Sequence, residues 1–294
     1  MKKAELAKRY RIESGKKFNL SDFDPADTWK LKSKDHAQQW LEEGVARLSE
    51  LQDLLYAQSQ WSLLLIFQAM DAAGKDGTIK HVMSGVNPQG CQVFSFKAPS
   101  DEDLNHDFLW RTTRCLPERG RIGIFNRSYY EEVLVVRVHP EWLSRQKLPS
   151  ALPTKMIWEE RFESINGLER HLARNGVVIL KFFLHLSKSE QRNRFLSRLE
   201  DPAKHWKFSA ADMRERQCWN DYQRAYEDVI RHTASPHAPW HVVPADHKWF
   251  SRLVVAEAIV GALESLNLSY PKVDKAKRKE LDAVRRELLA NKGR

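Results

Sequence analysis

Short apolar runs alternate along the chain with longer segments in which apolar residues recur at helical spacing. The runs, which we interpret as strands, lie at residues 62–67, 91–96, 121–126, 177–184 and 240–243. The helical segments lie near residues 34–58, 78–84, 102–115, 129–137, 154–174, 188–199, 209–233 and 248–266. Strands separated by helices predict an α/β fold with a parallel sheet covered on both faces. Ligands bind such sheets at the carboxyl ends of the strands.

The same pattern predicts one main domain with a segment on either side. Residues 33–270 contain no internal repeat and no Gly/Ser-rich linker. Residues 1–32 are polar and turn-rich, which favours an irregular N-terminal arm. Residues 271–294 are rich in Lys and Arg and include four helically spaced apolar residues: Leu281, Val284, Leu288 and Leu289. We expect this basic tail to be an exposed helix or an oligomer contact rather than a nucleic-acid arm.

Charge and cysteine content narrow the function class. Among 294 residues, 48 are Lys or Arg and 39 are Asp or Glu, a formal net charge of +9. This excess indicates an anionic partner: nucleic acid, a membrane surface or a polyanionic substrate. The three cysteines are far apart, which argues against disulfides or a zinc site and for a reducing compartment. No apolar run could span a bilayer and no signal peptide is evident, so we expect a cytoplasmic protein.

The segment after the first strand has the layout of a phosphate-binding loop. Gly74, Lys75, Gly77 and Thr78 lie between a buried strand and a helix. In such loops backbone N–H groups and a helix N-terminus face an anion, and the lysine adds a point charge. We therefore expect Gly74, Gly77 and Thr78 to bind phosphate and Lys75 to contact the transferred phosphoryl group. The alternative for Lys75 is an exposed lysine in a surface turn.

The loop departs from the common pattern G-x-x-x-x-G-K-[ST]. Ala69 stands at the first glycine, and Asp76 replaces the hydroxyl that binds Mg²⁺. The loop therefore contains two acids, Asp71 and Asp76. A carboxylate can lie next to a phosphate mainly when a divalent cation lies between the two anions. We expect Asp71 to bind that metal, Mg²⁺ or its substitute Mn²⁺, or to accept a proton from an attacking oxygen. Asp76 is typical of a helix cap or a turn, and we assign it no chemistry.

The third strand ends in a second polar group. Arg127 is a planar fork suited to phosphate, and a strand-end arginine without an acidic neighbour is unusual in a purely structural role. Asn126 stands where phosphate-loop enzymes usually place a metal-binding acid. Glu131 and Glu132 open the next helix, where acids could also simply satisfy the helix dipole. Arg137 could point into the same cleft or to the surface.

A basic stretch follows the fourth strand. Arg194 and Arg198 lie on one helix face, and Lys204 and Lys207 follow a proline-containing break. A basic hairpin over about residues 190–215 suits a lid that closes over phosphates and expels water. The alternatives are an exposed basic helical pair or, because a tryptophan separates the lysines, a surface for single-stranded nucleic acid. Four cations near strand ends are weaker candidates for polyanion binding: Lys80, Arg111, Lys181 and Lys188.

Four segments, in this order, resemble the polyphosphate kinase 2 family. They are residues 71–80 (Asp-Ala-Ala-Gly-Lys-Asp-Gly-Thr-Ile-Lys), 125–132 (Phe-Asn-Arg-Ser-Tyr-Tyr-Glu-Glu), 201–207 (Asp-Pro-Ala-Lys-His-Trp-Lys) and 244–250 (Pro-Ala-Asp-His-Lys-Trp-Phe). The resemblance implies a thymidylate-kinase-like P-loop fold with a helical lid, acting on polyphosphate and a nucleotide with Mg²⁺. It places Asp71 and Lys75 in the Walker A loop and Arg127 in the Walker B region. The implied lid residues are Arg194, Arg198, Lys204 and Lys207.

One position departs from many family members, which have Asp where this chain has Asn126. Asn126 with the following Glu131 and Glu132 is similar to the class III branch, which phosphorylates both AMP and ADP. Because an amide carries no charge, Asp71 would then supply more of the metal's anionic ligation, with help from Glu131 or Glu132 through water.

The leading hypothesis is therefore a phosphotransferase that uses polyphosphate to convert AMP to ADP and ADP to ATP. We expect a homo-oligomer with no nucleic-acid or membrane partner. An ATP-dependent nucleoside monophosphate kinase would share the fold and the lid, and the phosphoryl donor distinguishes the two. A non-catalytic module that binds nucleic acid is disfavoured by Asp71, because an acid repels a phosphate backbone unless metal intervenes.

Overall fold

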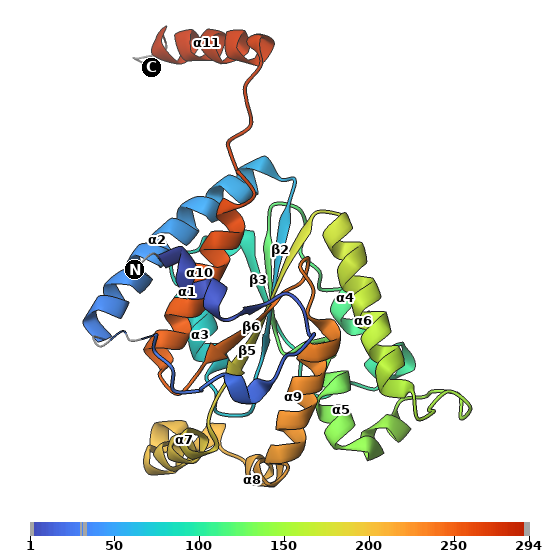
Figure 1. The fold of residues 1–294 in the computed structure, drawn as a ribbon. Coiled ribbons are helices and arrows are strands. Elements are labelled where there is room, and N and C mark those ends of the chain that lie inside the picture. Colours follow the sequence, from blue (N-terminus) through green and yellow to red (C-terminus); the bar gives the residue numbers. More distant parts are fainter. Residues whose placement is uncertain (1–2, 30, 32–33, 291–294) are drawn as a thin grey trace.

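A six-stranded sheet forms the centre of the computed structural model, which describes residues 3–29, 31 and 34–290 (Figure 1). The strand order is β1-β6-β5-β2-β4-β3. The strands are β1 (Arg11–Ile12), β2 (Ser62–Gln68), β3 (Cys91–Ser95), β4 (Ile122–Asn126), β5 (Val177–His185) and β6 (Trp240–Pro244). All neighbouring strands pair in parallel except β1, which is antiparallel to β6. The predicted α/β fold is confirmed, and β2 to β6 match the predicted runs to within one residue at each end.

Helices cover both faces of the sheet. They are α1 (Lys3–Arg9), α2 (Lys34–Gln58), α3 (Lys75–Val82), α4 (Trp110–Thr113), α5 (Val135–Val138), α6 (Ile157–Arg174), α7 (Lys188–Glu200), α8 (Ala210–Gln217), α9 (Trp219–Thr233), α10 (Lys248–Glu264) and α11 (Lys275–Ala290). One hydrophobic core lies between the sheet and α1, α2, α3 and α10. A second lies between the sheet, α6, α9 and the 3₁₀ helix η4 (Tyr129–Val133). The central strand β2 is buried along its whole length, which explains its uninterrupted apolar sequence.

Three predicted helices are shorter or divided. The segment expected at 102–115 forms only a 3₁₀ turn and the four-residue α4. The segment expected at 129–137 divides into η4 and α5, and the one at 209–233 divides into α8 and α9. Helical spacing of apolar residues does not reveal where a helix tightens or restarts, so these boundaries could not be predicted from periodicity.

The N-terminal segment is more ordered than predicted. Lys3–Arg9 is helical, and Arg11–Ile12 adds a strand to the edge of the sheet. Leu6 and Tyr10 are buried in the core against α10. The prediction of an irregular arm is therefore wrong for these residues. Leu6 and Tyr10 are four residues apart, so both side chains reach the core and hold the short helix α1 against α10.

The C-terminal helix α11 is confirmed as a helix, and Figure 1 shows it projecting away from the body. Its described side chains are exposed, including Leu281, Val284 and Leu288. In the part of the chain that the structure describes, no helix is long and apolar enough to cross a membrane.

Candidate functional site

The loop between β2 and α3 has the backbone of an anion-binding turn. Gly74 precedes α3 with φ of +102°, a conformation that side chains rarely adopt, and Ala72 has φ of +64°. The helix begins at Lys75, three residues earlier than predicted. Gly77 therefore lies in its first turn, while Thr78 is buried and donates its backbone N–H to Gly74 O at 2.9 Å. The first N–H groups of α3 have no partners within the helix and remain available to an anion.

Lys75 folds back inside this loop. Its Nζ donates to Ala69 O at 2.9 Å. Burial lowers the pKa of Lys75, and the nearby Arg127 lowers it further, while Asp71 and Glu131 oppose the shift. The prediction of an exposed surface lysine is therefore excluded, and Lys75 belongs to a compact group of charges.

Arg127 lies at the centre of that group. Its Nη2 is 3.3 Å from Asp71 Oδ1, and its Nη1 is 3.9 Å from Glu131 Oε2. The prediction that this arginine lacks an acidic partner is wrong, because the fold supplies two acids: Asp71 from the loop after β2 and Glu131 four residues further along the chain. Glu131 raises the pKa of Arg127. Burial raises the pKa of Glu131, while Arg127 and Lys75 lower it.

Asn126 and Asp76 face each other across the same strand ends. Asn126 Nδ2 donates to Asp76 Oδ1 at 2.7 Å. The helix cap expected of Asp76 is wrong, since Gly74 occupies the cap position. Asp76 instead joins α3 to the end of β4.

The surroundings of Asp71 fit a Mg²⁺ ion that is bound jointly with substrate phosphates rather than one enclosed by protein side chains. In the described residues no set of three or more His, Cys, Asp or Glu side chains could enclose a metal by itself. Asp71 is partly exposed, and only one of its oxygens contacts Arg127, so the carboxylate has acceptor capacity left. Mg²⁺ typically takes one or two carboxylates and completes its shell with phosphate oxygens and water.

A cavity of about 360 Å³ opens beside the charged group. Asp71, Arg127 and Glu131 form one wall. The other lining residues include apolar and aromatic side chains as well as further charges: Lys97, Arg111, Val135, Val136, Trp142, Arg145, Asp212, Glu215, Tyr222 and Tyr226. Tyr222 and Tyr226 are largely buried, and both line this cavity.

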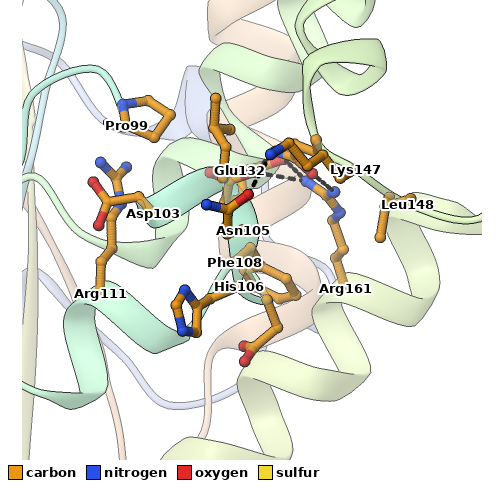
Figure 2. Close-up of a pocket in the computed structure, with 13 residues that line it drawn as sticks. Pro99, Asp103, Asn105, His106, Phe108, Arg111, Glu132, Lys147, Leu148 and Arg161 are labelled. Carbon is orange, nitrogen blue, oxygen red and sulfur yellow. Dashed lines mark hydrogen bonds and ion pairs between the residues drawn. The ribbon is translucent and has the colours of Figure 1, made fainter. Parts of the chain in front are cut away.

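A second cavity of about 310 Å³ (Figure 2) adjoins the first. Arg111, Glu132 and Gln146 are among the residues that line both cavities. Glu132 Oε2 accepts hydrogen bonds from Gln146 Nε2 at 2.5 Å and from the buried Arg161 Nη1 at 2.9 Å. Glu132 is therefore held by Arg161, which makes metal ligation through it less available than at Glu131. Arg111 donates to Lys97 O at 2.8 Å and borders both cavities.

Arg194 does not act as an exposed lid residue. Its guanidinium donates to Ala72 O and Ala73 O in the loop and to Ala245 O and Asp246 O after β6, at 2.6–3.0 Å. Every one of these acceptors is a backbone carbonyl, so the side chain joins the loop to the end of β6. Arg194 therefore holds the loop after β2 in place. The sequence pattern alone could not show this role, because the contacts join distant segments of the chain.

The remaining lid residues are nearer the surface. The helical hairpin of α7, the 3₁₀ helix η6 (Pro202–Lys207) and α8 lies beside the loop, and Ser209 and Asp212 form a capping box at the start of α8. Arg198 Nη1 is 3.9 Å from Asp212 Oδ2, and Lys204 Nζ is 2.6 Å from Asp201 Oδ2. The side chain of Lys207 lies outside the described part of the structure.

Two predicted cations are not at the cleft. Lys181 is 0% exposed and paired with Glu169 at 2.6 Å, so assigning it to polyphosphate binding is wrong. A strand that is buried on both faces keeps even its lysine in the core. Arg137 pairs with Asp228 of α9 at 2.7 Å and does not line either cavity. Lys80 and Lys188 are exposed on α3 and α7.

Two cations near the loop, Lys248 and Arg252 of α10, were not predicted from the sequence. Arg252 Nη2 lies 4.0 Å from the position a Cβ would take at Gly77. Burial lowers the pKa of Lys248, and Arg194 and Arg252 lower it further. Both residues follow the carboxyl end of β6, so the strand-end argument could have found them.

The family model, the relatives and the solved structure that match this chain all have names that refer to polyphosphate. A family model described as Polyphosphate kinase 2 matches residues 30–271. The chain is 56% identical to the ADP-polyphosphate phosphotransferase of Rhodopseudomonas palustris, covering 96% of this chain and 98% of the relative. It is 44% identical to the AMP/ADP-polyphosphate phosphotransferase of Meiothermus ruber, covering 92% and 98%. The crystal structure of Polyphosphate Kinase 2 from Arthrobacter aurescens matches with a TM-score of 0.85 and 41% identity, covering 95% and 96%.

Proposed function

We propose that this chain, which belongs to the polyphosphate kinase 2 family, transfers phosphoryl groups from inorganic polyphosphate to AMP and ADP, giving ADP and ATP. The observation that carries the proposal is the group formed by Asp71, Lys75 and Arg127 at the strand ends, beside a cavity with room for a nucleotide. Its fold is that of the P-loop kinases, with a mostly parallel sheet flanked by helices.

Catalysis in this site is positioning and charge neutralisation. An oxygen of the nucleotide's terminal phosphate attacks the end phosphorus of polyphosphate, one P–O bond forms and one breaks, and the polymer leaves one unit shorter. The attacking oxygen is already anionic at neutral pH, so no strong general base is needed. Arg127 presents a planar fork to the phosphates, and its acidic partners Asp71 and Glu131 hold that fork in place.

The two substrates would enter from different sides. The cavity next to Arg127 has aromatic and apolar walls formed by residues such as Trp142, Tyr222 and Val135, which suit a nucleoside. Lys248 and Arg252 near the loop, together with the exposed Lys80 of α3, do not line that cavity, and these cations form a second side that suits a polyanion. We assign the acceptor to the first side and polyphosphate to the second.

Magnesium would be held by Asp71, with Asp76 or Glu131 contributing through water, and would neutralise charge on the phosphates when bound. Mn²⁺ could substitute. Arg127 and Lys75 would keep the phosphates in line in its presence, because both cations are fixed by contacts within the protein.

Acceptance of AMP as well as ADP is supported by Asn126 and by the name of the Meiothermus relative. The ATP-dependent alternative is not favoured, because both of these relatives are named for polyphosphate. We further propose a cytoplasmic homo-oligomer, in which the net charge of +9 serves polyphosphate rather than nucleic acid or membrane.

A donor–acceptor matrix tests this proposal. Polyphosphate or ATP is offered with AMP, ADP, GMP or GDP, with and without Mg²⁺, and the products are separated by chromatography. We expect ATP from ADP and polyphosphate with no other nucleotide present, and ADP from AMP and polyphosphate. If only the ATP-containing reactions give product, the chain is a nucleoside monophosphate kinase and the proposal fails.

A further inference from the structure

An ion pair between Lys181 and Glu169 lies in the core and is not used by the proposed chemistry. Lys181 Nζ donates to Glu169 Oε2 at 2.6 Å, to Thr233 O at 2.8 Å and to the Tyr130 hydroxyl at 3.0 Å. The three donors of the ammonium are therefore satisfied. Well-packed apolar residues of similar volume often stabilise a core as well as such a pair does, so stability alone does not explain it.

Glu169 binds two consecutive tyrosines. Its Oε1 accepts from the Tyr129 hydroxyl at 2.9 Å and from the Tyr130 hydroxyl at 2.7 Å. Burial and the adjacent carboxylate raise the pKa of both phenols, so both remain hydrogen-bond donors. Hydrogen bonds are directional, and these two fix the positions of the rings in a way that apolar packing alone would not.

The two tyrosines come shortly after Arg127 in the chain. Arg127 has φ of +65°, in the left-handed region that is unfavourable for a side chain with a Cβ. A backbone conformation of this kind is kept only where several surrounding contacts hold it in place. Here Arg127 N donates to Phe67 O at 3.0 Å, and Ser128 Oγ accepts from Tyr130 N at 3.1 Å.

Helix α6 holds the same segment at a second point. Arg161 donates to the carboxylate of Glu132 at 2.9 Å and to its carbonyl at 3.1 Å (Figure 2). Arg161 and Glu169 are both buried and both belong to α6. Between these two fixed points lies Glu131, which borders the cavity and faces Arg127.

We propose that Lys181, Glu169, Tyr129 and Tyr130 form a positioning group that sets Arg127 and Glu131 for phosphoryl transfer. The group touches neither substrate and acts through the backbone turn that carries Arg127. This inference rests on the proposed function and adds to it the residues that orient its central arginine.

The test removes the two hydroxyls and keeps the rings. In Tyr129→Phe/Tyr130→Phe we expect kcat for ATP formation to fall about tenfold or more, because small displacements of a catalytic group are costly. The matched control is Tyr10→Phe, which removes a buried tyrosine's 2.8 Å hydrogen bond to Asp27 on the other side of the sheet. We expect its kcat to stay within about twofold of the parent. If the double variant does not fold, each single Tyr→Phe variant is measured against the same control.

A coupling measurement separates positioning from a general loss of stability. The same tyrosine substitutions are made in an Arg127→Lys protein, and rates are compared well below the unfolding temperature. If the group acts through Arg127, the fold-loss in kcat is much smaller in that background. Equal losses in both backgrounds, or a loss no larger than that of Tyr10→Phe, overturn the inference. Failure of the proposed function looks different, because the parent protein would then form no ATP from polyphosphate and ADP.

Discussion

Arg194 should be needed for stability before it is needed for substrate binding. It is 7% exposed, and it donates to Ala72 O, Ala73 O, Ala245 O and Asp246 O. Arg194→Met keeps most of the aliphatic volume and removes every donor. The loop carbonyls and the carbonyls after β6 then lose their shared partner.

The magnitude follows from the number of bonds. Four hydrogen bonds at about 1 kcal/mol each give about 4 kcal/mol of lost unfolding free energy. Glu190, which accepts from Arg194 Nε at 2.8 Å, is partly exposed and adds less than about 1 kcal/mol. A lysine could not replace the arginine, since one ammonium cannot span two backbone segments as a planar fork does.

The assay is urea unfolding followed by tryptophan fluorescence, with the slope of the transition checked for constancy. Arg192→Met is the matched control, because Arg192 is an exposed arginine on the same helix α7. We expect the control to lose less than about 1 kcal/mol. The reasoning is refuted if Arg194→Met also loses less than about 1 kcal/mol and instead raises only the KM for polyphosphate, as a direct phosphate ligand would.

Three further predictions concern the core, the donor side and pH. Lys181→Met should lower the unfolding free energy by about 3–5 kcal/mol in the same urea assay, because it leaves the buried Glu169 charge unpaired. Arg252→Ala should raise the KM for polyphosphate severalfold and leave the KM for ADP within about twofold in steady-state kinetics, if the donor passes the α10 side of the loop. Burial lowers the pKa of His185 to about 4 and that of His241 to about 3, from 6.5, so the unfolded chain binds more protons between those values. Stability should therefore be full above pH 6.5 and fall as pH decreases toward 4, and in urea unfolding across that range His241→Asn should reduce the slope. A slope unchanged by that substitution would contradict the assignment.

Much of this fold was predictable because its central strands are continuous runs of apolar residues. β2 and β5 are buried on both faces, so their sequences are nearly uniform apolar runs, and parallel pairing followed from the helices between them. The short strand β1 was missed, since two residues give no periodicity and their pairing partner, β6, is more than two hundred residues away.

The site was predictable where its chemistry lies within one segment. The loop from Asp71 to Gly77 and the strand end at Arg127 were both placed correctly at one edge of the sheet. What sequence could not supply was the contact between segments: the acids that flank Arg127, the four carbonyls that Arg194 joins, and the burial of Lys181. Each of these depends on which side chains the tertiary fold brings together, and residue type alone does not determine that.

The central claim is that phosphoryl transfer from polyphosphate takes place at the group formed by Asp71, Lys75 and Arg127. Its most direct test follows ATP formed from ADP together with the terminal phosphate lost from a polyphosphate of defined length, by ³¹P NMR. We predict one ATP for each unit removed from the polymer, with the rate reduced by orders of magnitude in Lys75→Ala and in Arg127→Ala while both proteins remain folded. ATP formation that continues at the parent rate in folded Lys75→Ala and Arg127→Ala proteins would contradict the account.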